Sequence, residues 1–216
     1  MSNWITRIFK APALSDFDNS LDRERLISTA RILFIDDEHP LLLDELSSAR
    51  FAVDHDQTGN DTRKIDSQIY DVIILDYHGV GQRLGANQGL SLLKHIRRVS
   101  PRSRVIAYTS RSLAAAESEF FRISHAVLPK DMGLADSLAF VEVEVRKALS
   151  KEHLFHALIE QLNISDAATK EKAHSALIGA LKRKDANGLK SFVTKLAGTA
   201  AEKGLSVLLT KLFPSP

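Results

Sequence analysis

Carboxylate side chains at the ends of two apolar runs are the residues in this sequence that could do chemistry. Asp76 closes a run that begins at Asp71, and the pair Asp36 and Asp37 closes an earlier run that begins at Arg31. In an open parallel sheet, binding sites form outside the carboxyl ends of the strands. Carboxylate oxygens are the ligands that Mg²⁺ takes in proteins. The sequence therefore predicts a magnesium site made by Asp36, Asp37 and Asp76.

Two later apolar runs would add other groups to the same edge. One ends at Thr109 and the other is followed by Lys130. If all four runs are parallel strands, a hydroxyl and an ammonium group join the three carboxylates.

These five residues, in this order, resemble the receiver domain of bacterial response regulators, and the resemblance covers about residues 31–150. It implies an α/β fold with a doubly wound, five-stranded parallel sheet of the flavodoxin-like type. It also implies a two-component or phosphorelay system, in which the partner is a histidine kinase or a phosphotransfer protein.

The resemblance assigns a role to each residue. Asp76 would be the phospho-acceptor that becomes an aspartyl-phosphate, Lys130 would contact the phosphoryl group, and Thr109 would be the switch hydroxyl. The metal ligands that it implies are Asp36 through a water, Asp37, Asp76 and the backbone carbonyl of His78.

Three departures from the family pattern lie near the expected site. The loop from Tyr77 to Gly89 is longer than usual and rich in glycine, which suggests a mobile lid or a docking surface. Asp131 stands where the family has a proline, so a trans bond is expected after Lys130. Val127 stands where the family often has an aromatic residue, so the signal is expected to leave by another route.

Bulk properties limit the class of protein. The chain has 216 residues, no cysteine and a formal net charge of +2. Without cysteine there is no disulfide framework, which fits a reducing cytoplasm. The near-neutral charge argues against a role dominated by nucleic-acid phosphates. No apolar run approaches the roughly 18 residues that a membrane-spanning helix needs.

The sequence divides into three parts. Residues 1–28 combine a short amphipathic helix, with Trp4 and Phe9 on its apolar side, and a polar linker at about residues 11–20. Docking on the body of the protein is favoured for this helix, and a membrane-surface anchor is the alternative. Residues 29–150 form the receiver, and residues 151–216 form a helical hairpin or bundle for interaction or dimerisation.

Alternating patterns within the receiver predict its elements. Strands are expected at 31–35, 51–55, 72–75, 105–108 and 126–128, and helices at 40–49, 62–68, 89–99 and 113–122. Such alternation predicts a parallel sheet with right-handed crossovers.

Beyond residue 133, apolar residues recur at helical spacing, with neither glycine nor proline before Asn163. This pattern predicts one long rod from Leu134, with His153 and His156 on its surface. A helix to about Lys184 and a final helix at 189–212 should follow. The apolar stripe is covered either by the tail itself or by a second copy in a homodimer, with a smooth Ala/Gly face at 197–204 as a second contact.

The leading functional interpretation is an atypical response regulator in which phosphorylation of Asp76 switches a helical interaction or dimerisation output. The alternative is a scaffold that keeps the receiver fold but acts without phosphorylation. A DNA-binding transcriptional regulator is disfavoured, because no compact helix-turn-helix unit is visible. No enzymatic output is expected, because no catalytic motif follows Lys130.

Overall fold

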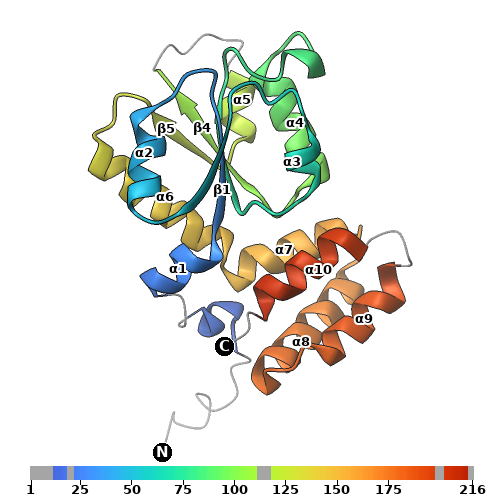
Figure 1. The fold of residues 1–216 in the computed structure, drawn as a ribbon. Helices are drawn as coiled ribbons and strands as arrows, with labels where there is room; N and C mark the ends of the chain where they lie inside the picture. Colours follow the sequence, from blue (N-terminus) through green and yellow to red (C-terminus); the bar gives the residue numbers. More distant parts are fainter. Residues whose placement is uncertain (1–11, 19–21, 111–117, 198–201, 214–216) are drawn as a thin grey trace, which may run out of the picture.

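Five parallel strands form the sheet in the upper part of the computed structural model (Figure 1), which describes residues 12–18, 22–110, 118–197 and 202–213. The strands are β1 (Arg31–Ile35), β2 (Ala52–Asp56), β3 (Val72–Asp76), β4 (Arg104–Thr109) and β5 (Ala126–Pro129). Their order in the sheet is β2-β1-β3-β4-β5. The order reverses between β1 and β3, which places a topological switch point at the carboxyl ends of these two strands.

Helices cover both faces of the sheet (Figure 1). The helices α1 (Arg23–Thr29), α2 (Leu41–Ser48) and α6 (Leu134–Ala148) pack on one face, and α3 (Arg63–Asp66), α4 (Gly89–Val99) and α5 (Ser118–Ile123) pack on the other. Along β3, Val72 and Ile74 join the first core cluster, and Ile73 and Leu75 join the second. Because both faces are covered, this strand is apolar at successive positions. The predicted fold class is confirmed.

The long rod predicted from Leu134 is wrong. α6 ends at Ala148, and a separate helix, α7 (Lys151–Gln161), follows. Ser150 has an extended backbone, and its hydroxyl oxygen accepts a hydrogen bond from the backbone N–H of His153 at 3.2 Å. Ser150 is therefore the N-cap of α7. A serine cap can end one helix and begin the next without glycine or proline.

The final predicted helix is two helices in the structure. α8 (Ala167–Arg183) precedes α9 (Asn187–Ala197), and α10 (Glu202–Leu212) follows. α9 packs mainly on α8, whereas α10 packs on α7. The two halves of one apolar stripe thus cover different partners. Most of the Ala/Gly face at 197–204 lies outside the described residues and side chains.

The helices α7 to α10 form a second unit with its own core. Apolar side chains from all four helices are buried together, among them Leu158, Leu177, Val193 and Leu208. The stripe that suggested a dimer is therefore covered within one chain.

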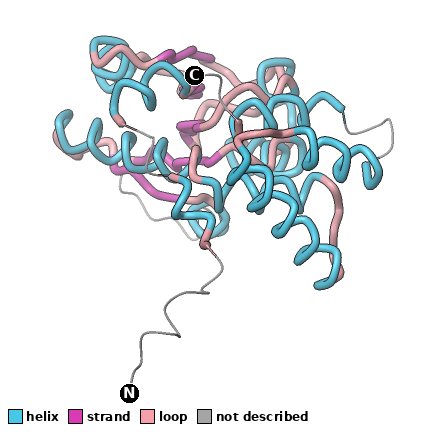
Figure 2. Tube along the Cα trace, turned by 90° about the horizontal axis from the view of Figure 1, so that it is seen from below, coloured by secondary structure: helices cyan, strands magenta, loops and turns pink. Residues whose placement is uncertain are grey.

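Seen from below, helices lie on both sides of the strands (Figure 2). No helix in the described ranges is long and apolar enough to cross a membrane.

The segment predicted as a polar linker contributes to packing instead. Its 3-10 helix η2 (Leu14–Phe17) places Leu14 in the core of the helical unit with 3% of its surface exposed. Asp18 accepts a hydrogen bond from the backbone N–H of Lys151 at 2.9 Å. The predicted amphipathic helix before it lies outside the described residues.

The helical unit is attached below the sheet, at the amino ends of the strands (Figure 1). The ammonium group of Lys211 on α10 lies 2.8 Å from Oδ2 of Asp71 and also donates to the backbone carbonyl of Thr29. Oδ1 of the fully buried Asp71 accepts from Arg102 at 2.5 Å. His153 contacts the carbonyl of Arg102 at 2.7 Å, so its predicted place on a rod surface is wrong.

Candidate functional site

The three predicted carboxylates lie together at the carboxyl edge of the sheet. Asp36 follows β1 directly, and Asp76 is the last residue of β3, its neighbour in the sheet. Asp36, Asp37 and Asp76 each offer an oxygen within 4.8 Å of the others. Asp36 and Asp76 are buried, whereas Asp37 is exposed. The cluster is thus open to solvent on one side only.

Lys130 joins this cluster from the end of β5. Its ammonium group lies 2.9 Å from Oδ2 of Asp76 and 2.8 Å from Oδ2 of Asp36. The contact with Lys130 is the one partner of the buried Asp36 Oδ2 in the described ranges, so this oxygen keeps lone-pair capacity for a second cation. A buried carboxylate oxygen of this kind is a ready ligand for a cation.

Charge at the site leaves room for a divalent cation. Burial raises the pKa of Asp76, and the hydrogen bond from Lys130 partly offsets this. Burial lowers the pKa of Lys130, but its contacts with Asp36 and Asp76 outweigh burial, and the net pKa is raised. Lys130 is therefore charged, and one ammonium faces three carboxylates. The two uncompensated negative charges and the all-oxygen donor set fit Mg²⁺.

Thr109 ends β4 beside the acceptor strand. It is 8% exposed, and its carbonyl accepts from the backbone N–H of Lys130 at 2.7 Å. The preceding residue, Tyr108, is in register with Asp76, and its ring centre lies 5.1 Å from the Lys130 ammonium group. This cation–π contact holds the lysine over the site. The sequence interpretation missed Tyr108, although its place before Thr109 was a usable signal.

Two glycines let the backbone pass close to the acidic edge, which is the carboxyl edge of the sheet that bears Asp36, Asp37 and Asp76. Gly79 has φ +71°, and a Cβ atom there would overlap the carboxylate of Asp37. A Cβ atom on Gly89 would lie 2.5 Å from the carbonyl oxygen of Asp76. Both positions need glycine, because backbone and carboxylate approach each other too closely for a side chain.

The long loop after Asp76 has a defined conformation. Val80 is fully buried in the core between the sheet and α4. The backbone N–H of Gly81 donates to the carbonyl of Thr58 at 2.7 Å, and that of Arg83 donates to Asn60 Oδ1 at 3.0 Å. These bonds attach the loop to the segment after β2. Its role as a lid stays a prediction.

The remaining predicted positions lie around this edge. The ring of His78 packs against Tyr77 with their centres 4.9 Å apart, and metal binding by its carbonyl stays a prediction. No cis peptide bond is present in the described residues, so the bond after Lys130 is trans. Val127 is 40% exposed and offers no aromatic ring there.

Comparison with known proteins gives a likeness in structure. No protein-family model and no curated protein matches the sequence. A CheY-like receiver domain protein from Methanospirillum hungatei JF-1 is 18% identical, with a TM-score of 0.47 over 55% of this chain and 95% of that chain. The response regulator TrrA from Thermotoga maritima is 24% identical, with a TM-score of 0.45 over 53% and 98%.

A longer match includes part of the chain after the sheet. NtrX from Brucella abortus is 16% identical, with a TM-score of 0.50 over 69% of this chain and 33% of that chain. At these identities the likeness concerns the fold. The strand order, the crossover helices between the parallel strands and this likeness together show that the chain has the receiver fold of response regulators, followed by further helices.

Proposed function

We propose that this chain is an atypical response regulator that is phosphorylated on Asp76 with the help of Mg²⁺. The observation that carries the proposal is the position of Lys130, whose ammonium group lies within 3 Å of carboxylate oxygens of both Asp76 and Asp36. A histidine kinase or a phosphotransfer protein in the cytoplasm would supply the phosphoryl group.

The acceptor carboxylate is held for attack on phosphorus. Oδ1 of Asp76 accepts from the backbone N–H of Tyr77 at 2.7 Å, and Oδ2 pairs with Lys130. A carboxylate oxygen bonds to the phosphorus of the donor, and the bond between phosphorus and the leaving atom breaks with its electron pair going to the leaving group. Lys130 then pairs with a phosphoryl oxygen, and the Thr109 hydroxyl donates to another.

Mg²⁺, when bound by Asp36, Asp37, Asp76 and the carbonyl of His78, would neutralise the negative charge that gathers on the phosphoryl oxygens. The chain's own share is positioning: Gly79 leaves space for Asp37, and Tyr108 holds the lysine over the acceptor. We propose no further enzymatic activity beyond this self-catalysed transfer.

The helical unit is the proposed output. It contacts the amino ends of β1, β3 and β4. The carboxyl ends of these three strands bear, in the same order, the pair Asp36 and Asp37, then Asp76, and then Thr109. The homodimer expected from the sequence is not the output we favour, because the side chains that suggested it, such as Val145 and Leu158, are buried within one chain. Recognition of another protein, and not of nucleic acid, is therefore the output we favour.

Mass spectrometry tests the proposal. Incubation with acetyl phosphate and Mg²⁺ should add one phosphoryl group that hydroxylamine removes. Asp76→Asn should abolish the addition, whereas Asp44→Asn, which changes an exposed carboxylate on α2, should leave it intact. Addition to Asp76→Asn at the wild-type level would refute the acceptor assignment. A complete lack of addition to the wild type would favour the phosphorylation-independent scaffold.

A further inference from the structure

The imidazole of His125 lies between two hydrogen-bond donors. The backbone N–H of Val105 donates to its Nδ1 at 2.8 Å, and Nη1 of Arg97 lies 2.6 Å from its Nε2. A guanidinium group only donates, and a neutral imidazole has one N–H and one lone pair. Because Nδ1 uses the lone pair, the proton is on Nε2. Two donors therefore face each other between Arg97 and His125, and no acceptor among the described residues joins them.

Protonation of His125 would not resolve this contact, because both ring nitrogens would then be donors. Burial, together with the charges of Arg97 and Arg104, lowers the pKa of His125 to about 3. The imidazole is thus neutral near pH 7, with its one N–H directed to Arg97. An acceptor with negative charge would satisfy both donors if it displaced their direct 2.6 Å contact and accepted from each of them.

A neighbouring pair on the same helix shows the completed arrangement. Nη2 of Arg98 lies 3.2 Å from Nδ1 of His95, and Nε2 of His95 lies 2.9 Å from the carboxylate of Asp66. There the lone pair accepts from arginine, and the N–H donates to an anion. His125 has the arginine but, as far as the described segments go, no carboxylate in the corresponding place.

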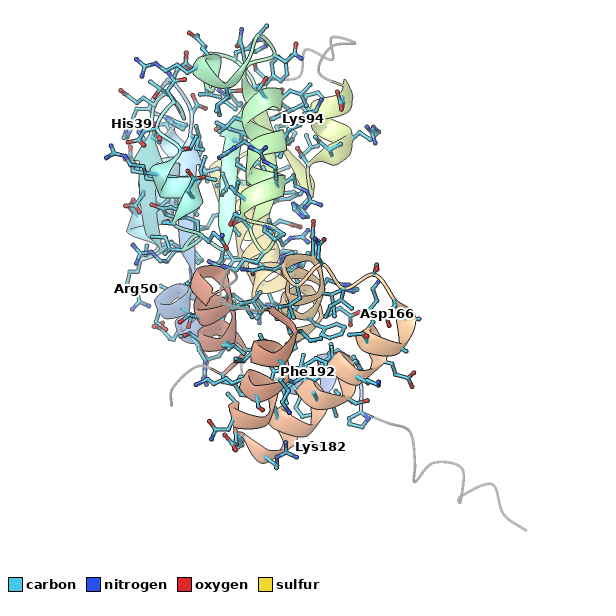
Figure 3. The ribbon with its side chains drawn as sticks, turned by 90° about the vertical axis from the view of Figure 1, so that its right-hand side faces the viewer. His39, Arg50, Lys94, Asp166, Lys182 and Phe192 are labelled. Atoms are coloured by element: carbon cyan, nitrogen blue, oxygen red, sulfur yellow. The ribbon has the colours of Figure 1, made fainter. Side chains whose placement is uncertain are left out.

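A pocket of about 520 Å³ opens beside His125, between α4 and α5. Figure 3 labels Lys94 on α4, at the side of this helix that faces α5. The lining side chains are Lys94, Arg97, Arg122, Ile123, Ser124 and His125.

Two of the cations near this pocket are already compensated: Lys94 pairs with Glu119 at 3.0 Å, and Arg104 pairs with Glu144 at 2.6 Å. Within the described part of the chain, neither Arg97 nor Arg122 has a carboxylate at ion-pair distance. The pocket thus combines two uncompensated guanidinium groups with an imidazole N–H.

We propose that this pocket binds a tetrahedral oxyanion of the phosphate class, either free or as the phosphate group of a small molecule. Its oxygens accept from Nε2 of His125 and from Arg97, and Arg122 pairs with it from α5. Charge-assisted bonds to guanidinium groups are the usual means of holding such an anion. The pocket is separate from the acidic edge, since His125 precedes β5 and Lys130 follows it.

The pocket also lies next to the contact between the receiver and the helical unit of α7 to α10. The ring of His153 on α7 packs edge-on against His125 with their centres 6.0 Å apart. A bound anion would therefore lie one side chain away from the helical unit.

Nuclear magnetic resonance of the full chain with ¹⁵N-labelled histidine tests the site, in the absence of Mg²⁺ and of any phosphodonor. Titration with inorganic phosphate should move the Nε2 resonance of His125 in a saturable way. Ribose 5-phosphate forms the second arm. Tighter binding of this ester would identify a small phosphorylated ligand, and equal binding would identify the free anion; both results support the site.

Arginine variants separate this pocket from a general charge effect. Arg97→Gln and Arg122→Gln should each weaken phosphate binding about tenfold or more, which corresponds to the loss of one charge-assisted bond. Arg98→Gln is the matched control, because Arg98 lies on the same helix and already pairs with His95; it should change binding less than about twofold. Arg122 is exposed, so its variant should fold normally. An unmoved His125 resonance with both probes, or equal weakening by all three variants, would overturn the proposal.

Discussion

Lys211→Met removes the ammonium group that joins the last helix to the sheet and keeps most of the side chain's hydrocarbon. Lys211 is 12% exposed, and its partner Asp71 is fully buried just before β3. The lysine also donates to the carbonyl of Thr29, just before β1. The change therefore removes one cation and two hydrogen bonds from the contact between the two units, with little loss of packing.

The expected loss is about 2 kcal/mol of unfolding free energy. Removal of one partner from a buried ion pair costs about 3–5 kcal/mol when the other charge is left alone. Asp71 is not left alone, because Arg102 still lies 2.5 Å away and the backbone N–H of Arg31 still donates at 2.9 Å. A hydrogen bond to a charged group contributes about 1.5–3 kcal/mol, and methionine avoids the cost of burying an ammonium group.

Urea unfolding measures this loss as a free energy, and thermal unfolding measures it as a change in Tm. In a chain of this size, about 2 kcal/mol corresponds to a decrease in Tm of about 4–8 °C. Lys190→Met is the control, because Lys190 is exposed on α9, and its effect should stay within about 0.5 kcal/mol. The difference between the variants should persist at high salt, because buried pairs are little screened.

Equal stability of Lys211→Met and Lys190→Met would refute the reasoning. That result would mean that the contact between α10 and Asp71 contributes no net stability, and that apolar packing alone attaches the helical unit. Asp71→Asn sharpens the test, because it leaves Lys211 and Arg102 buried without their anion. Its loss should exceed that of Lys211→Met, with about 3–5 kcal/mol expected.

Three further predictions concern the acidic edge, pH and assembly. Gly79→Ala should weaken Mg²⁺ binding about tenfold or more by calorimetry, because its Cβ overlaps a ligand carboxylate, whereas Gly133→Ala has space and should not; equal affinities would contradict this. Burial lowers the pKa of His125 to about 3 and also lowers that of His153. The unfolded chain then binds more protons than the folded chain between about pH 3 and pH 6.5, so the unfolding free energy in urea titrations should have its full value above about pH 6.5 and decrease toward pH 3. A His125 resonance that titrates near pH 6.5 would contradict this prediction. Sedimentation should show a monomer at tens of micromolar, because the apolar faces of α7 to α10 cover one another; a stable dimer would instead restore the homodimer as the output.

The sequence alone determined the sheet and the residues at its edge. Each strand is a short apolar run, and its last residues reveal which side chains reach the carboxyl edge. Asp76 and Thr109 end their strands, and Lys130 follows β5 directly. These features are local, because a strand covered on both faces is apolar throughout and parallel strands bring their ends to one edge.

Only the tertiary structure decided how the tail is arranged. Apolar residues at helical spacing show that a face is buried, but they do not show what covers it. The same pattern therefore suited a rod, a dimer and the observed pair of helices separated at Ser150. The glycine at position 79 likewise acquires its role only when the loop returns to the carboxylate of Asp37.

Charged contacts between distant segments were also invisible in the sequence. Lys211 and Asp71 are 140 residues apart, and Arg97 and His125 are 28 apart. No local pattern specifies such pairs, because the charge that a side chain meets depends on which segments pack beside it. The sequence determined the chemistry of the acidic edge, whereas packing decided how the helices are attached and where donors are left without an acceptor.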